Sequence, residues 1–304
     1  MLQSSVPRHM WLTLRRREAL WFHIFVAPWI IGFLVFTLYP TVAALYLSFT
    51  RYNALHPPIF VGLANYHTLF QDPVFFTSLR VTFTYAIIAV PLHLAIGLLL
   101  AVLLNQRIRA MRFIRTVYYM PAVLPAVIVA LMWIWLFDYN FGLINYIIYS
   151  LLHIRGPDWL GDPHWVMPAI ILASLWGVGA PMVIYLAGLQ SIPKELYEAA
   201  EVDGANQLRR FFAITIPLIS PVTFFNFIIG LISSLQIFTN IYVLTGGGPD
   251  YASYFYNLYL YNNAFQFFKL GIASAQAWIL FVIIMVLTLL AFRTAGRAVY
   301  YGGS

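Results

Sequence analysis

The sequence contains no cysteine, which excludes disulfides and thiolate metal sites. Charge is also scarce, because charged residues make up 9% of the 304 positions, against about a quarter in ordinary soluble domains. The only lysines are Lys194 and Lys269, and neither follows a glycine loop of the kind that cradles ATP phosphates. Hydrophobic residues instead make up 62% of the chain. The composition therefore predicts a membrane protein that binds no ATP itself.

Long apolar runs recur along the chain at intervals that suit a bundle of membrane spans. One helical crossing of a bilayer needs about 20 apolar residues. Runs of this length lie near residues 21–49, 81–104, 117–137, 166–190, 213–237 and 271–292. They predict an all-α, polytopic membrane protein with six transmembrane helices. In the third run, Pro121 and Pro125 predict a break.

The stretch from Tyr251 to Phe268 is rich in Tyr, Phe and Asn and is too polar to span a bilayer. Rings with one polar edge are stable where one end is wet. We therefore expect an amphipathic segment that lies at the outer membrane interface.

The basic residues show how the predicted spans are oriented. Thirteen of the 17 Lys and Arg residues fall in the tails and loops of one side, and four fall on the other. Because cytoplasmic loops carry the excess of positive charge, both termini are predicted to be cytosolic. The formal charge of +7 then reflects topology and not nucleic-acid binding. The residues of the predicted cytosolic side are Arg8, Arg15, Arg16, Arg17, Arg107, Arg109, Arg112, Arg115, Lys194, Arg209, Arg210, Arg293 and Arg297, and those of the external side are Arg51, Arg80, Arg155 and Lys269.

This topology divides the chain into three parts. Residues 1–20 are predicted to form a basic cytosolic tail, residues 21–293 the six-helix transmembrane domain, and residues 294–304 a second cytosolic tail. The first apolar run is longer than the roughly 7–15 residues of a signal-peptide core, so we expect it to be retained.

One polar island interrupts the predicted cytosolic side between the fourth and fifth spans. Residues 191–203 read SIPKELYEAAEVD, where Pro193 suits the first turn of a helix and Gly204 suits its end. Two short cytosolic helices are predicted within the loop 191–212. Taken alone, the pattern also fits a solvated amphipathic loop helix with no partner.

The spacing in this loop is similar to a known signature. Glu198-Ala199-Ala200, then Gly204, then Ile214 and Pro217 resembles the cytosolic motif of permease subunits in binding-protein-dependent ABC importers, with Ile216 where that family usually has Leu. Three further stretches resemble the carbohydrate-type subfamily of maltose and glycerol-3-phosphate permeases. They are residues 60–66 (FVGLANY), 133–137 (WIWLF) and 244–249 (LTGGGP).

The resemblance implies the partners and the role of the loop. It implies that short coupling helices dock in a cleft of an ATP-binding subunit through Glu198, Ala199, Ala200, Gly204, Ile214 and Pro217. ATP and magnesium would be bound by that ATPase, with no cofactor in this chain. The implied assembly contains a second homologous permease, two ATP-binding subunits and an external substrate-binding protein, in the inner (cytoplasmic) membrane of a bacterium or archaeon.

A line of small and polar residues on the fifth span suggests where substrate passes. Asn226, Gly230, Ser233 and Asn240 recur at i, i+4, i+7 and i+14, with Gln236 beside them. Hydrogen bonding between helices would explain the same line equally well. The resemblance favours a substrate path, because it implies that the fourth and fifth spans line that path. The residues predicted to form it are Trp176, Gly177, Ser233, Ser234, Gln236 and Asn240.

The remaining polar residues indicate no chemistry. No Ser/His/Asp set, carboxylate pair or metal-ligand spacing is evident, so an enzyme and a metal site are not expected. His93 lies inside the second span and is interpreted as a packing residue. Acids are missing from the middle of the spans, which argues against the alternative of an autonomous secondary transporter or channel. A membrane scaffold without transport is a third possibility. We expect a permease that forms half of the path for a sugar or oligosaccharide. The spans have no Arg or Lys near the middle of the membrane, which favours a neutral saccharide over a phosphorylated one.

Overall fold

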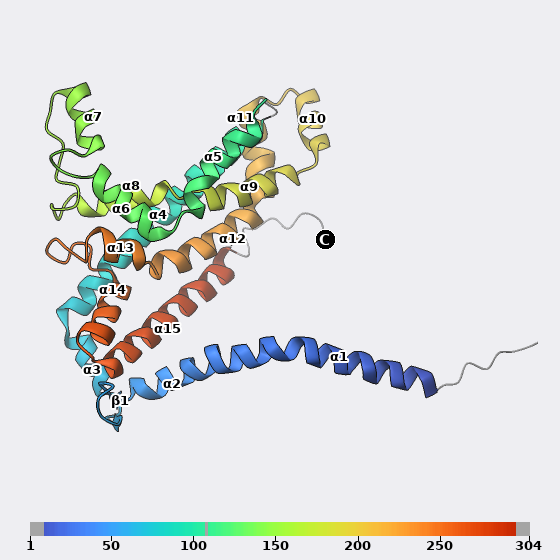
Figure 1. The fold of residues 1–304 in the computed structure, drawn as a ribbon. Coiled ribbons are helices and arrows are strands. Elements are labelled where there is room, and N and C mark those ends of the chain that lie inside the picture. The colour runs from blue at the N-terminus through green and yellow to red at the C-terminus, as the bar shows by residue number, and fades with distance from the viewer. Residues whose placement is uncertain (1–8, 107–108, 296–304) are drawn as a thin grey trace, which may run out of the picture.

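The computed structural model describes residues 9–106 and 109–295, and Figure 1 shows that helices make up most of this part of the chain. The strands assigned within it are β1 (Thr50–Arg51) and β2 (Ile59–Phe60), which pair antiparallel. The all-α prediction is therefore confirmed. Arg8, Arg107 and Arg297, which the topology prediction used, lie outside the described residues.

The helices alternate between long spans and short connecting pieces. In chain order they are α1 (His9–Phe33), the π-helical turn η1 (Leu34–Leu38), α2 (Tyr39–Ser48), α3 (Ala64–Gln71), α4 (Pro73–Leu104), α5 (Met111–Val123), α6 (Ala126–Leu136), α7 (Leu143–Leu152), α8 (Val166–Leu175), α9 (Gly179–Gln190), α10 (Lys194–Val202), α11 (Gln207–Arg210), η2 (Phe211–Thr215), α12 (Ile216–Leu235), α13 (Thr239–Leu244), α14 (Tyr256–Tyr261), η3 (Asn262–Gln266) and α15 (Leu270–Ala295).

Six segments of the described chain are long and apolar enough to cross a membrane, if each bent pair counts as one span. Four are continuous, namely Arg16–Ser48, Pro73–Leu104, Gln207–Leu235 and Leu270–Thr294. The other two are the pairs α5 with α6 and α8 with α9. These segments correspond to the six apolar runs of the sequence, so a polytopic helical fold is confirmed. Helix α1 begins at His9, inside the stretch predicted as a tail.

The two bent spans have prolines at their breaks. Helices α5 and α6 meet at 97° across Leu124 and Pro125, whose backbones are both extended. Proline lacks an N–H and disfavours the helical region for the residue before it, so the break predicted in this span is confirmed. Helices α8 and α9 bend by 44°, a break that the sequence analysis did not predict. There, Pro181 cannot donate to the carbonyl of Gly177, one turn earlier.

Helix α4 lies at the centre of the bundle and packs against α9, α12 and α8, while α2 packs against α15. Its buried residues join a core that includes Tyr85, Ala89 and Leu235. Figure 1 shows α1 extending away from the other helices. In the same view, α10, α11, the start of α1 and the end of α15 lie toward one end of the molecule, which we call the α10 end. The opposite end, which we call the α7 end, contains α3, α7, α13 and α14.

The stretch from Tyr251 to Phe268 is largely buried within the protein, and its position at the outer membrane interface stays a prediction. It folds into α14 and η3, which pack against α4 and α15, and Phe255 and Tyr256 are fully buried. Burial is possible because several of its polar groups find partners inside the protein. The Tyr256 hydroxyl donates to the carbonyl of Gln276 at 2.8 Å, and Asn263 Nδ2 donates to Gln276 Oε1 at 3.1 Å.

The stretch 60–66 fastens the first span to the bundle. Asn65 is buried and donates through Nδ2 to the carbonyls of Ser48 and Thr50, both at 2.8 Å. The hydroxyl of Tyr66 lies 2.8 Å from Ser48 Oγ. These bonds satisfy carbonyls at the end of α2, so this family-like stretch has a structural role.

Candidate functional site

Two short helices, α10 and α11, occupy the loop 191–212 at the α10 end of the molecule (Figure 1). Pro193 precedes α10 with an extended backbone, and its missing N–H costs nothing at a helix start. At the other end Gly204 has a φ of +76°, and Ala205 N donates to Ala200 O at 2.8 Å. A residue with a side chain is strained at this φ, so glycine suits the turn between the two helices.

One face of this loop is anchored and the other is open. Ile192 and Tyr197 pack against the cluster formed by α4, α9 and α12, and the Tyr197 hydroxyl lies 2.9 Å from Thr215 Oγ1. Glu198 and Ala199 are exposed, and Val202 is 89% exposed. These side chains are therefore accessible to a partner on the open face of the loop.

The two helices are joined by an ion pair that leaves Glu198 free. Arg210 Nη1 donates to Glu201 Oε2 at 2.9 Å, and Asn206 caps α11 by accepting from Arg209 N at 2.8 Å. Within the described parts of the chain, no basic group pairs with Glu198. The carboxylate that the sequence singles out is therefore available to a partner.

Ile214 and Pro217 connect the loop to α12. Ile214 lies in the π turn η2 and packs against the same buried cluster as Tyr197, while Pro217 falls in the first turn of α12. The N–H of Ile216 reaches back five residues to the carbonyl of Phe211, which defines the π turn. The predicted coupling residues therefore lie on one connected element, from α10 to the start of α12.

A cavity of about 410 Å³ lies between α4, α8, α9 and α12. Its wall contains four of the six residues predicted for the substrate path, Gly177, Ser233, Ser234 and Asn240. Tyr85, Ala89, Val90, His93, Leu94, Ser174, Ala180, Pro181, Ile184, Asn226, Ile229, Gly230 and Ile237 complete the wall. The small polar line on the fifth span therefore faces a cavity.

Asn240 offers the clearest binding group in this cavity. Its Oδ1 atom is buried and has no hydrogen-bond partner within the described residues. Two serines of the wall are engaged, since Ser234 Oγ donates to Leu231 O at 2.9 Å and Ser174 Oγ donates to Ile171 O at 2.7 Å. A buried acceptor without a donor is costly, and a ligand hydroxyl would satisfy it.

Trp176 and Gln236, the other two predicted path residues, do not line the cavity. Trp176 ends α8 and makes an edge contact with Trp133 at a centroid distance of 6.4 Å. Gln236 is exposed at the end of α12, and its backbone oxygen accepts from Asn257 Nδ2 at 2.7 Å. Their roles in transport stay predictions.

The wall also includes residues that the sequence analysis missed, notably Tyr85, His93 and Ser174. The signal for α4 was present, because Tyr85, Ala89 and His93 recur every four residues and so share one helix face. That face was indistinguishable from an ordinary packing face until its neighbours were known. Among the described residues, no group of three His, Cys, Asp or Glu side chains could hold a metal ion.

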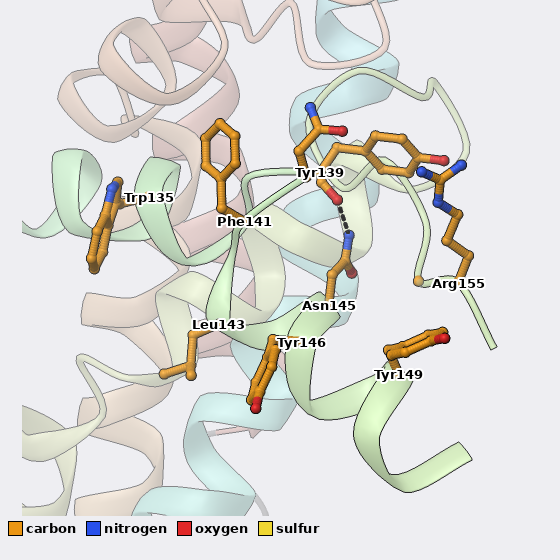
Figure 2. Close-up of a pocket in the computed structure, with 10 residues that line it drawn as sticks. Trp135, Tyr139, Phe141, Leu143, Asn145, Tyr146, Tyr149 and Arg155 are labelled. Atoms are coloured by element: carbon orange, nitrogen blue, oxygen red, sulfur yellow. Dashed lines mark hydrogen bonds between the residues drawn. The ribbon is translucent and has the colours of Figure 1, made fainter. Parts of the chain in front are cut away.

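A larger hollow of about 830 Å³ lies at α7, and Figure 2 shows its aromatic wall. Asn145 donates to the carbonyl of Tyr139 at 3.2 Å, and the guanidinium of Arg155 lies 5.3 Å from the centre of the Tyr139 ring. None of the predicted site residues lines this hollow. Size alone therefore does not identify the path, whereas the smaller cavity contains four of the residues predicted to form it.

Six apolar segments, a cavity between three of them and short helices at one end are the features of a polytopic helical membrane protein. Residues 93–299 match the family described as "Binding-protein-dependent transport system inner membrane component". The match covers more than half of the chain, so the protein belongs to this family. The family is a class of transport permeases and not of enzymes.

Curated relatives and solved structures agree with this membership. The chain is 41% identical to the probable ABC transporter permease protein YesP of Bacillus subtilis, over 94% of each chain. It is 36% identical to the trehalose/maltose transport system permease protein MalF of Thermococcus litoralis, over 91% of this chain and 94% of that one.

A bacterial ABC transporter that imports the acidic polysaccharide alginate is similar in structure, with a TM-score of 0.83 and 26% identity, over 95% of this chain and 99% of that one. The alginate transporter has also been solved in complex with its periplasmic protein, which carries an alginate pentasaccharide; that structure gives 25% identity and a TM-score of 0.83, over 97% of this chain and 100% of the other. The chain is thus a permease subunit of an ABC importer.

Proposed function

We propose that this permease forms half of the translocation path for a sugar or oligosaccharide. The observation that carries the proposal is the cavity between α4, α8, α9 and α12, with the unpartnered Oδ1 of Asn240 in its wall. Saccharides present many hydroxyl donors, and a site with few fixed polar groups in an apolar wall can orient them. The names of the relatives support a saccharide, since they include trehalose/maltose and alginate importers.

The α10 end is proposed to face the cytosol and to dock an ATPase. Arg112 and Arg115, at the start of α5, lie at this end with α10 and α11, whereas Arg51 and Lys269 lie at the other. Glu198, with Ala199 and Ala200 beside it, would contact a cleft of the ATPase, which would bind ATP and magnesium. Both chain termini would then be cytosolic.

The remaining partners follow from the same assignment. A second permease would complete the path, two ATPases would bind from the cytosol, and an external substrate-binding protein would dock at the α7 end. The alginate transporter bound to its periplasmic protein supports the last of these. The family description supports location in the inner membrane of a bacterium or archaeon.

The test is purification of the tagged permease from its native membrane, followed by an ATPase assay of the complex. We expect an ATPase and a second permease to co-purify, and we expect hydrolysis to rise when the binding protein and its sugar are added. Sugar uptake by the permease alone in proteoliposomes, without ATP, would instead support the autonomous transporter. The cavity argues against that alternative, because no Asp, Glu, Arg or Lys lines it in the described chain.

Replacing Asn240 with Leu should lower sugar uptake about tenfold, because the path loses a buried hydrogen-bonding group. The amount of complex in the membrane should not change, since Oδ1 has no partner in the described protein to lose. Uptake of labelled sugar into proteoliposomes, normalised to complex, checks both expectations. Gln236→Leu is the comparison variant. The sequence predicts that it also reduces uptake, but because Gln236 lies outside the cavity we expect a smaller reduction than in Asn240→Leu. Unchanged uptake in Asn240→Leu would remove this residue from the path.

A further inference from the structure

A pocket of about 300 Å³ lies at the α7 end, where the chain leaves the first span and enters the last one. Its wall contains Arg51 of β1 and Lys269, the residue that directly precedes α15. The two segments are held together, because Gly271 N donates to Tyr52 O at 3.2 Å. Two basic side chains that are distant in sequence therefore line one pocket, which we call the basic pocket.

Neither cation of the basic pocket is paired within the described chain. The ion pairs found there do not involve Arg51 or Lys269, and no Asp or Glu lines the pocket. The ammonium of Lys269 lies 5.8 Å from the centre of the Phe267 ring, a contact that gives its N–H groups no acceptor oxygen. Because like charges in one site repel each other, an anion bound between the two cations would lower the free energy.

The basic pocket lies at the depth where lipid headgroups begin. The first span ends at Ser48 and the last begins at Leu270, and the helices α2 and α15 that form these ends pack against each other. Arg51 follows Ser48 by three residues, and Lys269 directly precedes Leu270. The headgroup layer is about 5–8 Å thick on each side of the apolar core, and long basic side chains at span ends reach into it. The anions at this depth are phosphate groups of phospholipids.

Exposed phenyl rings beside the cations favour a lipid over a free anion. Phe267 and Phe268 line the basic pocket, and each is 56% exposed. A phospholipid presents a phosphate to the cations and apolar chains to such rings, whereas a free phosphate would leave the rings in water. A zwitterionic headgroup also carries a cation, which Arg51 and Lys269 would repel, so a lipid of net negative charge fits best.

We propose that the basic pocket binds the phosphate group of an anionic phospholipid, with Arg51 and Lys269 as its ligands. A guanidinium can donate two parallel N–H bonds to phosphate oxygens, and an ammonium adds a point charge. The bound phosphate neutralises the repulsion between the cations and joins the end of the first span to the start of the last. This site is separate from the cavity and from the coupling residues, and it does not depend on which solute the permease carries.

The experiment uses photoactivatable lipids, because mapped labelling separates this pocket from other basic surfaces of the complex. The permease, with the subunits that co-purify, is reconstituted into phosphatidylcholine vesicles that contain a small fraction of photoactivatable phosphatidylglycerol. Labelling of residues 51–68 and 267–272 is measured by mass spectrometry in wild type and in the double variant Arg51→Gln with Lys269→Gln. Arg80→Gln is the matched control, since Arg80 is exposed on α4 and lies outside the pocket.

At lipid fractions below saturation, we expect labelling to fall about thirtyfold in the double variant, since each basic residue near an anionic lipid surface strengthens binding about fivefold. Arg80→Gln should stay within about twofold of wild type. Exchanging the cations, in Arg51→Lys with Lys269→Arg, should keep labelling within about threefold, because both charges remain. This exchange separates the loss of charge from a disturbed fold. In wild type, a photoactivatable phosphatidylcholine should label the same residues about tenfold less.

Several results would overturn the proposal. Equal labelling in wild type and the double variant would show that the cations do not hold the lipid. Equal labelling of wild type by the two lipid probes would show no preference for an anionic headgroup, and this comparison needs no variant. Loss of wild-type labelling in millimolar inorganic phosphate would identify a site for free phosphate. Loss of labelling on addition of the external binding protein would instead assign the two cations to a protein contact.

Discussion

Reversing the charge at Glu198 should uncouple ATP hydrolysis from uptake. In Glu198→Lys we expect uptake to fall at least about thirtyfold, because the loss of one partner of an interfacial charge pair costs about 2–5 kcal/mol. The side chain is exposed on α10 and has no basic partner in the described chain, so the variant should fold and insert normally. Uptake and binding-protein-stimulated ATPase activity, measured on the same proteoliposomes, check the prediction.

Glu195→Lys is the matched control for this experiment. Glu195 is exposed on the same helix, in its first turn, and lies outside the predicted coupling residues. We expect its uptake to stay within about twofold of wild type, since an exposed charge at a helix start contributes only about 0.3–1 kcal/mol. Equal loss in both variants would mean that the net charge of the loop matters and that Glu198 has no special role. Wild-type uptake in Glu198→Lys would contradict ATPase docking through this residue.

The ion pair between Glu201 and Arg210 helps to explain how a force applied at α10 alone could move the span that contains α12. It joins α10 to α11 at 2.9 Å, and Tyr197 joins α10 to Thr215 just before α12. An ATPase that displaces α10 would then move these elements together, as rigid-body transmission requires. An isolated exposed ion pair is weak, so we place the stiffness in the sum of these contacts and the turn at Gly204.

The parts of the fold that were predictable depend on local chemistry. Apolar runs of about 20 residues predict spans because a helix alone satisfies its backbone in lipid. The break near Pro125 follows from proline, and the turn at Gly204 follows from the freedom of glycine. The helices α10 and α11 were predictable for the same reason, since their start and stop signals lie within the loop itself.

The parts that were missed depend on which distant groups meet. The burial of α14 rests on partners such as Gln276 in α15, which no local pattern of Tyr and Asn reveals. Likewise, one polar line on α12 could face a cavity or a helix, and only the placement of α4 and α8 decides between them. The same placement brings His93 to the cavity and leaves Gln236 outside it.

The largest effect on folding is expected at Gly271, where α15 passes close to the end of the first span. A Cβ at this position would lie 2.0 Å from the backbone oxygen of Thr50, far inside contact distance. That oxygen also accepts from Asn65 Nδ2 at 2.8 Å, and Gly271 N donates to Tyr52 O at 3.2 Å. Neither β1 nor α15 can therefore move away without losing one of these hydrogen bonds.

Gly271→Ala should therefore destabilise the protein by about 3 kcal/mol or more, a large effect for one methyl group. We expect a lower yield and a lower melting temperature of the purified complex. The melting temperature is measured by heating samples and quantifying the remaining complex by size-exclusion chromatography. Gly32→Ala in α1 is the control, because nothing in the described chain beyond its own turn of helix lies within 4 Å of the added Cβ, and alanine favours a helix. Its melting temperature should equal or slightly exceed that of wild type. Equal melting temperatures for Gly271→Ala and wild type would show that α15 does not approach the first span this closely in the membrane.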